Sequence, residues 1–201
     1  GLPGWVNHGY NFWFSSSATA QDANQANFPL GLWGPLNGSS NGLGESPQGG
    51  AFIALDGAFA TGPIEQSVNG MVAGDSYTLS FYWAASQEYS FNGNTQQSLT
   101  ASFGDQSHTT STVNLGNHAF SGWTQETWNF TWDGNSSTLS FLAQGSPAVP
   151  PFTLVDGVSL VDNTTTPSAV PEPSTILSSL LGVAGLAVYG LRRRASSIAR
   201  E

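Results

Sequence analysis

Few side chains in this sequence of 201 residues are of the types that do chemistry, and their spacing argues against catalysis. There is no cysteine, which excludes thiol catalysis and thiolate metal sites. The three histidines, His8, His108 and His118, form no H-x-H or H-x-x-x-H pair, which argues against a zinc site. Ser76 follows Gly74-Asp75 but begins a predicted strand, whereas a serine nucleophile needs a helix after it and a distant histidine partner. We therefore expect no catalytic residue.

Carbohydrate chemistry is the remaining possibility. A glycosidase needs two carboxylates at a defined separation, and no motif in the sequence identifies such a pair. We expect no enzyme, with a carbohydrate-active hydrolase as the alternative. A sugar-binding site needs only aromatic rings and a few amide or hydroxyl groups. Tyr82 is the first candidate because it is an aromatic residue on the polar face of its predicted strand. Trp123, Tyr89 and Trp33 lie near predicted loops and follow, although each of these rings also suits a packing role.

Fixed positive charge is confined to the end of the sequence. There is no lysine, and all four arginines lie in the last ten residues. Residues 1–191 therefore carry 12 of the 13 acidic residues and no Lys or Arg. A domain without cationic side chains cannot neutralise phosphates, which excludes nucleic-acid binding. The acidic surface indicates solubility in an extracellular medium and leaves cation binding open.

Alternation of apolar and polar residues predicts strands along most of residues 1–161. In residues 76–83, Tyr77, Leu79, Phe81 and Trp83 share one face. Strands are predicted at 76–83, 98–103, 126–132, 138–143 and 152–161, and more weakly at 51–55 and 64–68. No window in this part shows sustained helical periodicity. Seven or so short antiparallel strands predict an all-β head, a two-sheet antiparallel sandwich or jelly roll, with Trp83, Trp128 and Trp132 in its core.

The C-terminal part has a different composition. Residues 162–169 are a Thr/Ser/Pro linker, and residues 176–191 are an uncharged apolar run. As a helix this run spans about 24 Å, slightly less than a bilayer core of about 30 Å. Arg192, Arg193 and Arg194 follow it, which by the positive-inside rule places residues 195–201 in the cytoplasm and the head outside. We expect one transmembrane helix at 176–191, with a buried helix of a globular domain as the alternative.

Residues 170–175, VPEPST, precede this run, and two prolines flanking a glutamate require an extended segment. The hexapeptide, the apolar run and the arginine cluster together resemble the PEP-CTERM sorting signal of Gram-negative bacteria over residues 170–194. The resemblance implies cleavage by an exosortase near the Pro-Glu-Pro, membrane anchoring before cleavage, and then a place on the cell surface or in the extracellular matrix. It also implies exopolysaccharide as a partner. The processing motif comprises Val170, Pro171, Glu172, Pro173 and Ser174.

The head also resembles a known family. Residues 50–57, 64–68, 73–81 and 154–160 are similar to galactose-binding-like jelly rolls. The resemblance implies a carbohydrate-binding head, with a purely structural matrix protein as the other non-enzymatic possibility. Such domains open with a short strand before a Gly-Trp pair; Gly4-Trp5 is present, so we expect that strand and a signal peptide upstream of Gly1. In related jelly rolls an Asp at the position of Asp156 helps to hold a structural Ca²⁺. Carboxylate oxygens are the ligands that this cation prefers. A turn residue beside Gly157 is the alternative.

Overall fold

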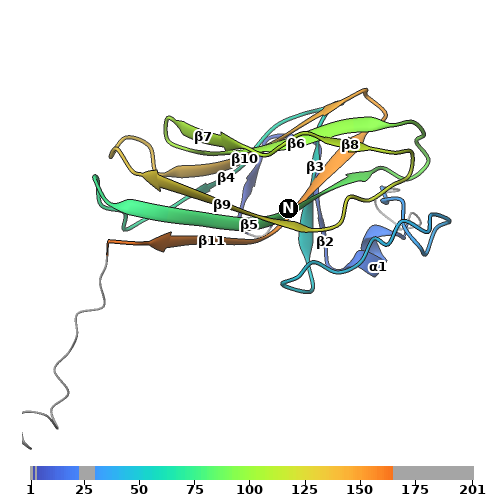
Figure 1. Cartoon of the computed structure of the whole chain (residues 1–201), viewed down its shortest axis with the longest axis horizontal. Helices are drawn as coiled ribbons and strands as arrows, with labels where there is room; N and C mark the ends of the chain where they lie inside the picture. Colours follow the sequence, from blue (N-terminus) through green and yellow to red (C-terminus); the bar gives the residue numbers. More distant parts are fainter. Residues whose placement is uncertain (1, 3, 23–29, 165–201) are drawn as a thin grey trace, which may run out of the picture. The chain divides into compact units, whose positions relative to one another are not determined.

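The computed structural model describes residues 2, 4–22 and 30–164 (Figure 1). They form eleven strands and one short helix. In chain order these are β1 (Val6–Asn7), β2 (Asn11–Phe14), α1 (Ser17–Ala20), β3 (Phe52–Asp56), β4 (Ile64–Ser67), β5 (Ser76–Gln87), β6 (Thr95–Phe103), β7 (Gln106–Thr109), β8 (Val113–Leu115), β9 (Thr124–Thr131), β10 (Thr138–Ser146) and β11 (Pro151–Asp162).

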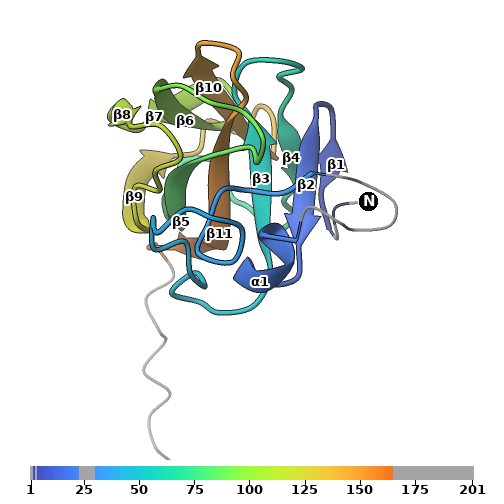
Figure 2. The same cartoon turned by 90° about the vertical axis from the view of Figure 1, so that its right-hand side faces the viewer.

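The strands form two antiparallel sheets that pack face to face (Figures 1 and 2). The first sheet has the order β1-β4-β10-β6-β7, with β8 pairing β6. The second has the order β2-β3-β11-β5-β9. Long strands lie at the centre of each sheet, and the short strands β1 and β2 form neighbouring edges. The prediction of an all-β, two-sheet antiparallel sandwich is confirmed.

Alternating side chains place the main core between the sheets. Leu79, Phe81 and Trp83 of β5 face Leu99 and Phe141 of the other sheet, and all five are buried. Trp128 and Trp132 pack against this core while partly buried, as expected. A second cluster covers the outer face of β3, β5 and β11, where α1 and the segment around residues 30–43 fold over the sheet. Its buried members are Phe14, Ala20, Leu30, Leu32, Leu43, Phe52, Ala54, Ala84, Phe152 and Leu154.

All seven predicted strands are present, and several are longer than their period-2 patterns. β5 continues to Gln87 because its outer face there is covered, so Ala84, Ala85 and Ser86 are all buried and the alternation disappears. β1, β2, β7, β8 and α1 were not predicted. They are two to four residues long, too short to show a period. Ser16 caps the single turn of α1 through a reciprocal pair of bonds with Thr19.

The predicted linker, transmembrane helix and arginine cluster fall almost entirely in residues 165–201, outside the described part of the chain. The same holds for the processing motif at residues 170–174. Among the described residues, no helix has the length and apolar character needed to cross a membrane.

Candidate functional site: a tryptophan-flanked cleft between the sheets

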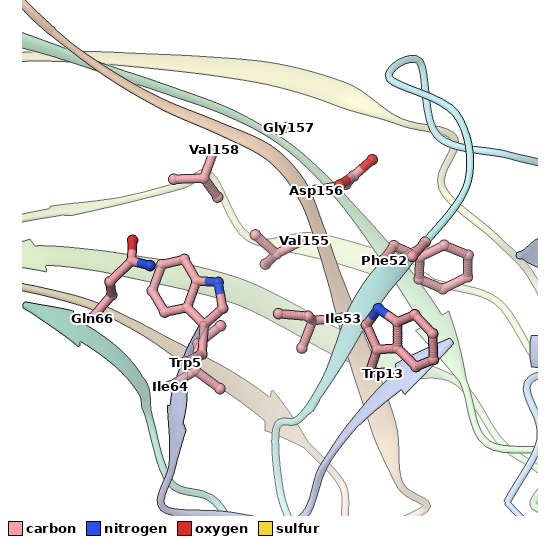
Figure 3. A pocket seen from close by; sticks show the side chains of 11 residues that line it. Trp5, Trp13, Phe52, Ile53, Ile64, Gln66, Val155, Asp156, Gly157 and Val158 are labelled. Atoms are coloured by element: carbon pink, nitrogen blue, oxygen red, sulfur yellow. The ribbon is translucent and has the colours of Figure 1, made fainter. Parts of the chain in front are cut away.

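A cleft of about 430 Å³ opens at the edge of the sandwich (Figure 3). At this edge β1 and β2 lie side by side (Figure 2). One wall comes from the first sheet and the segment before it, with Trp5, Ile64 and Gln66. The other comes from the second sheet, with Trp13, Ile53 and Val155 among its residues. The cleft is thus built by chain segments up to about 150 residues apart, which only the folded sandwich brings together.

The cleft exists because β11 is longer than its neighbour β3. β3 pairs with β11 only over Phe152–Val155, whereas β5 follows β11 to Asp162. Beyond Val155, no described strand pairs with the edge of β11 that faces β3. The backbone groups of that edge therefore have no strand partner among the described residues.

A β-bulge directs this part of β11 toward the cleft. The register with β5 shifts between Asp156 and Ser159, and Gly157 has a φ of +61°. A Cβ at Gly157 would lie 2.6 Å from Cγ of Gln48, so a larger residue would strain the bulge as well as its backbone. The bulge places Asp156, Gly157 and Val158 along the cleft.

Two indole rings flank the cleft (Figure 3). Trp13 stands in β2 and is 46% exposed, an unusual state for so large an apolar side chain. Trp5 is half-buried, and its ring packs edge-on against Phe141 of the core at 5.7 Å between centroids. Trp5 is thus held in place, while Trp13 offers surface to a ligand. Ile53 and Val155 lie between the two rings and give the cleft an apolar floor.

Gln66 supplies a polar side chain to the cleft. Gln66 Nε2 donates to the carbonyl of Gly4, at 3.0 Å, which fixes the amide beside Trp5. Asp156 also borders the cleft, but its side chain lies on the outer face of the sheet, because Asp156 pairs with Tyr82 whereas its neighbour Val155 pairs with the buried Trp83. On that face the Asp156 carboxylate accepts a hydrogen bond from the hydroxyl of Ser46, and Figure 3 shows the side chain directed away from the two indole rings. Asp156 is the only charged residue among the described residues that line the cleft. Aromatic rings beside a few oriented hydrogen-bonding groups are the chemistry of saccharide sites.

The structure brings two of the predicted site residues together on the outer face of the second sheet, and Tyr82 does not line the cleft. Tyr82 of β5 is the cross-strand partner of Asp156, and its Cδ2 lies 3.1 Å from where a Cβ of Gly157 would stand. Tyr82 therefore packs over the bulge. No group of three or more His, Cys, Asp or Glu side chains gathers to hold a metal in the described part of the chain. A Ca²⁺ role for Asp156 stays a prediction.

The other predicted ligand residues lie elsewhere. Trp33 and Tyr89 contact each other at 4.6 Å between centroids, and His118 stacks on Trp33. Trp123 packs against Phe52 in the outer cluster, and its Nε1 donates to the carbonyl of Gly44 at 3.3 Å. None of these three predicted residues lines the cleft. Their roles as ligand residues stay predictions.

The carboxyl groups of Glu88 and Asp56 lie near Tyr10, away from the cleft. Burial raises the pKa of Glu88 from its ordinary 4.5 to about 7, with the Asp56 carboxylate as the second cause. The Asp56 side chain accepts backbone N–H bonds from Ala58, Phe59 and Ala60, which closes the turn after β3. Neither acid lines the cleft, and the bonds of Asp56 give it a structural role.

Sequence reasoning missed Trp5, Trp13 and Gln66 as site residues. One signal was present for Trp13, which lies between Phe12 and Phe14 in a strand. Alternation places it on the opposite face from the two phenylalanines that cover the outer cluster. Nothing local distinguishes Gln66 from the many other amides in the sequence.

Comparison with protein-family models identifies the tail. Residues 169–194 match the PEP-CTERM protein-sorting motif. The chain carries a PEP-CTERM sorting signal. The expected resemblance is confirmed over this segment, and a signal of this kind implies export to the cell envelope. The PEP-CTERM motif covers only the tail, so the function of the head depends on its own structure.

Solved structures with a fold like that of the head include carbohydrate-binding proteins. TmCBM61 in complex with β-1,4-galactotriose is 11% identical with a TM-score of 0.41, and the match covers 79% of this chain and 88% of that one. The CBM22-1 xylan-binding domain of Paenibacillus barcinonensis Xyn10C is 9% identical with a TM-score of 0.41, covering 80% and 86%. At these identities and TM-scores the similarities carry neither a fold family nor a ligand over to this chain. No curated protein gives a significant match.

Proposed function

We propose that this PEP-CTERM protein is a non-enzymatic protein of the cell surface or extracellular matrix, whose head binds a saccharide in the cleft between Trp5 and Trp13. The observation that carries the proposal is the half-exposed Trp13 ring beside an apolar floor and the anchored amide of Gln66. An aromatic ring of this size stays in contact with water at a stability cost unless a ligand covers it.

In this proposal each group of the cleft has a role. Trp13 lies against the apolar face of a sugar ring, and the Gln66 amide bonds its hydroxyl groups. The open edge of β11 adds backbone donors and acceptors. The C-terminal signal delivers the protein to an exosortase, which cuts in residues 170–174 and releases the head from its membrane helix. The head then meets exopolysaccharide outside the cell.

The test is a titration of the full chain with neutral oligosaccharides, followed by calorimetry or by tryptophan fluorescence. Saturable binding that Trp13→Ala weakens at unchanged stability is the expected result. An open strand edge also suits an extended peptide, which adds as a further strand. Saccharide binding that survives Trp13→Ala unchanged would reject the cleft as the sugar site and favour that other occupant.

A further inference from the structure

The end of the cleft beside Trp5 is lined mainly by apolar side chains. Figure 3 shows Val158 and Gln66 on this side of the cleft. Ile53 and Val155 continue the apolar surface toward the second indole ring. Val155 is 2% exposed, and both Trp5 and Val158 pack against the buried core, so these walls are fixed. Because apolar walls cannot bond hydroxyl groups, a ligand that fills this end must bring apolar surface of its own.

One amide supplies the polar side chain at this end. Gln66 Nε2 donates to the carbonyl of Gly4 at 3.0 Å, which fixes the orientation of the side chain and makes Oε1 its acceptor. The Trp5 end therefore offers one oriented acceptor beside apolar surface. The ligand group that fits such a place carries an N–H or O–H next to a methyl group.

Charged substituents have no counterpart in the cleft. The Asp156 carboxylate lies on the outer face of its sheet, where it bonds Ser46, so it is directed out of the cleft. Residues 1–191 contain no Lys or Arg that could pair with a carboxylate or sulfate. Since an unpaired charge loses free energy when it leaves water, the Trp5 end suits an uncharged substituent.

We propose that the Trp5 end of the cleft binds the acetamido group of an N-acetylated hexosamine, while the sugar lies against Trp13. The acetamido methyl group contacts Val158, and its N–H donates to Oε1 of Gln66. Its carbonyl lies toward the edge of β11 that has no strand partner among the described residues. A 6-deoxy sugar would bring a methyl group without the amide donor and acceptor. This inference rests on the proposed function, because it assigns a ligand class to the same cleft.

Three neutral trisaccharides with the same β-1,4-linked glucan backbone test the acetamido contact on the full chain. Tri-N-acetylchitotriose carries the complete group, its N-formyl analogue lacks only the methyl groups, and cellotriose has hydroxyl groups instead. Calorimetry should show that the acetylated trimer binds about fourfold more tightly than the formylated one, the effect of one buried methylene group. Cellotriose should bind about tenfold more weakly than the acetylated trimer, because it lacks both the methyl group and the amide.

Two Val→Thr variants in β11 locate the methyl contact. Val158→Thr replaces a methyl group of the cleft wall by a hydroxyl group at nearly constant shape. We expect it to reduce the difference between the acetylated and formylated trimers to less than about twofold. Val161→Thr makes the same change at a residue that is 52% exposed and does not line the cleft, so it should preserve the fourfold difference.

The outcomes separate the inference from the proposed function. Equal affinities of the three trimers for the unmodified protein, or a fourfold difference that survives Val158→Thr, would overturn the inference and leave saccharide binding in place. Absence of binding of all three trimers would reject the saccharide function itself. The comparison of ligands uses the unmodified protein, so it decides the question whatever Val158→Thr does to stability.

Discussion

The His118 imidazole stacks on the Trp33 indole, with 3.8 Å between ring centroids and 23° between planes. Nε1 of Trp33 donates to the carbonyl of Phe91 at 2.8 Å, and Nε2 of His118 lies 2.8 Å from Oδ1 of Asn92. The two rings thus join three segments that are distant in sequence: the loop around residue 33, the turn after β5 and the loop before β9. A ring engaged in this way contributes to the packing of the loops.

Trp33→Ala should therefore lower the free energy of unfolding by about 2 kcal/mol, somewhat less than the loss for a fully buried aromatic residue. Urea unfolding followed by circular dichroism measures this change. Leu36→Ala in the same loop is the control, because Leu36 is 70% exposed and its truncation should change stability by less than about 0.5 kcal/mol. Unchanged stability with lost saccharide binding would restore Trp33 as a ligand residue.

In contrast to Trp33→Ala, the variant Trp13→Ala should lose saccharide affinity rather than stability. We expect saccharide affinity to fall at least about tenfold, because one face of the sugar loses its aromatic contact, while the free energy of unfolding falls by about 1 kcal/mol or less. Phe59→Ala removes a ring that is 72% exposed and does not line the cleft, so it should leave affinity unchanged. Equal losses of affinity in both variants would point to general surface adhesion.

Glu88 makes stability depend on pH. Its pKa is raised in the folded state to about 7, so between about pH 4.5 and 7 the folded protein holds a proton that the unfolded chain has released. The associated stability is full below pH 4.5 and is lost as the pH rises through 7. Because Glu88 is only half-buried, the loss should be about 1 to 2 kcal/mol after allowance for solvent screening.

Glu88→Gln should remove this part of the pH dependence, so that the variant is the more stable protein above pH 7. Thermal unfolding of both proteins from pH 4 to 9 provides the difference curve, in which the common titration of other groups cancels. A difference that stays flat from pH 4 to 9 would show that Glu88 is solvated in the folded protein.

In the proposed function, cleavage at the sorting signal defines the mature C-terminus. In a strain with an exosortase, mass spectrometry should find a protein that ends within residues 170–174, and in a strain without the enzyme the intact tail. Glu172→Ala in the motif should leave the tail intact in both strains. An intact tail of the unmodified protein in both strains would leave a plain membrane anchor and reject the sorting step of the proposed function.

The local pattern of the sequence determined which segments form strands and which side chains fill the core. Leu79, Phe81 and Trp83 alternate with polar residues, and alternation fixes their face because successive side chains point to opposite sides of a strand. The sorting signal of the tail could also be recognised from the sequence, because its motif, apolar run and arginines are contiguous. The sequence alone also shows that no Lys or Arg precedes residue 192, which excludes nucleic-acid binding by the head.

Only the tertiary structure decided where a ligand would bind. Trp5, Trp13, Gln66 and Val155 come from four segments. Their meeting depends on the extension of β11 beyond the end of its pairing with β3 and on the bulge at Gly157. Tyr82 and Asp156, which were predicted as separate site residues, became neighbours through the pairing of β5 with β11. Trp33 packs against His118 and Tyr89. Strand pairing and register are long-range properties, and local alternation carries no information about which strands become neighbours.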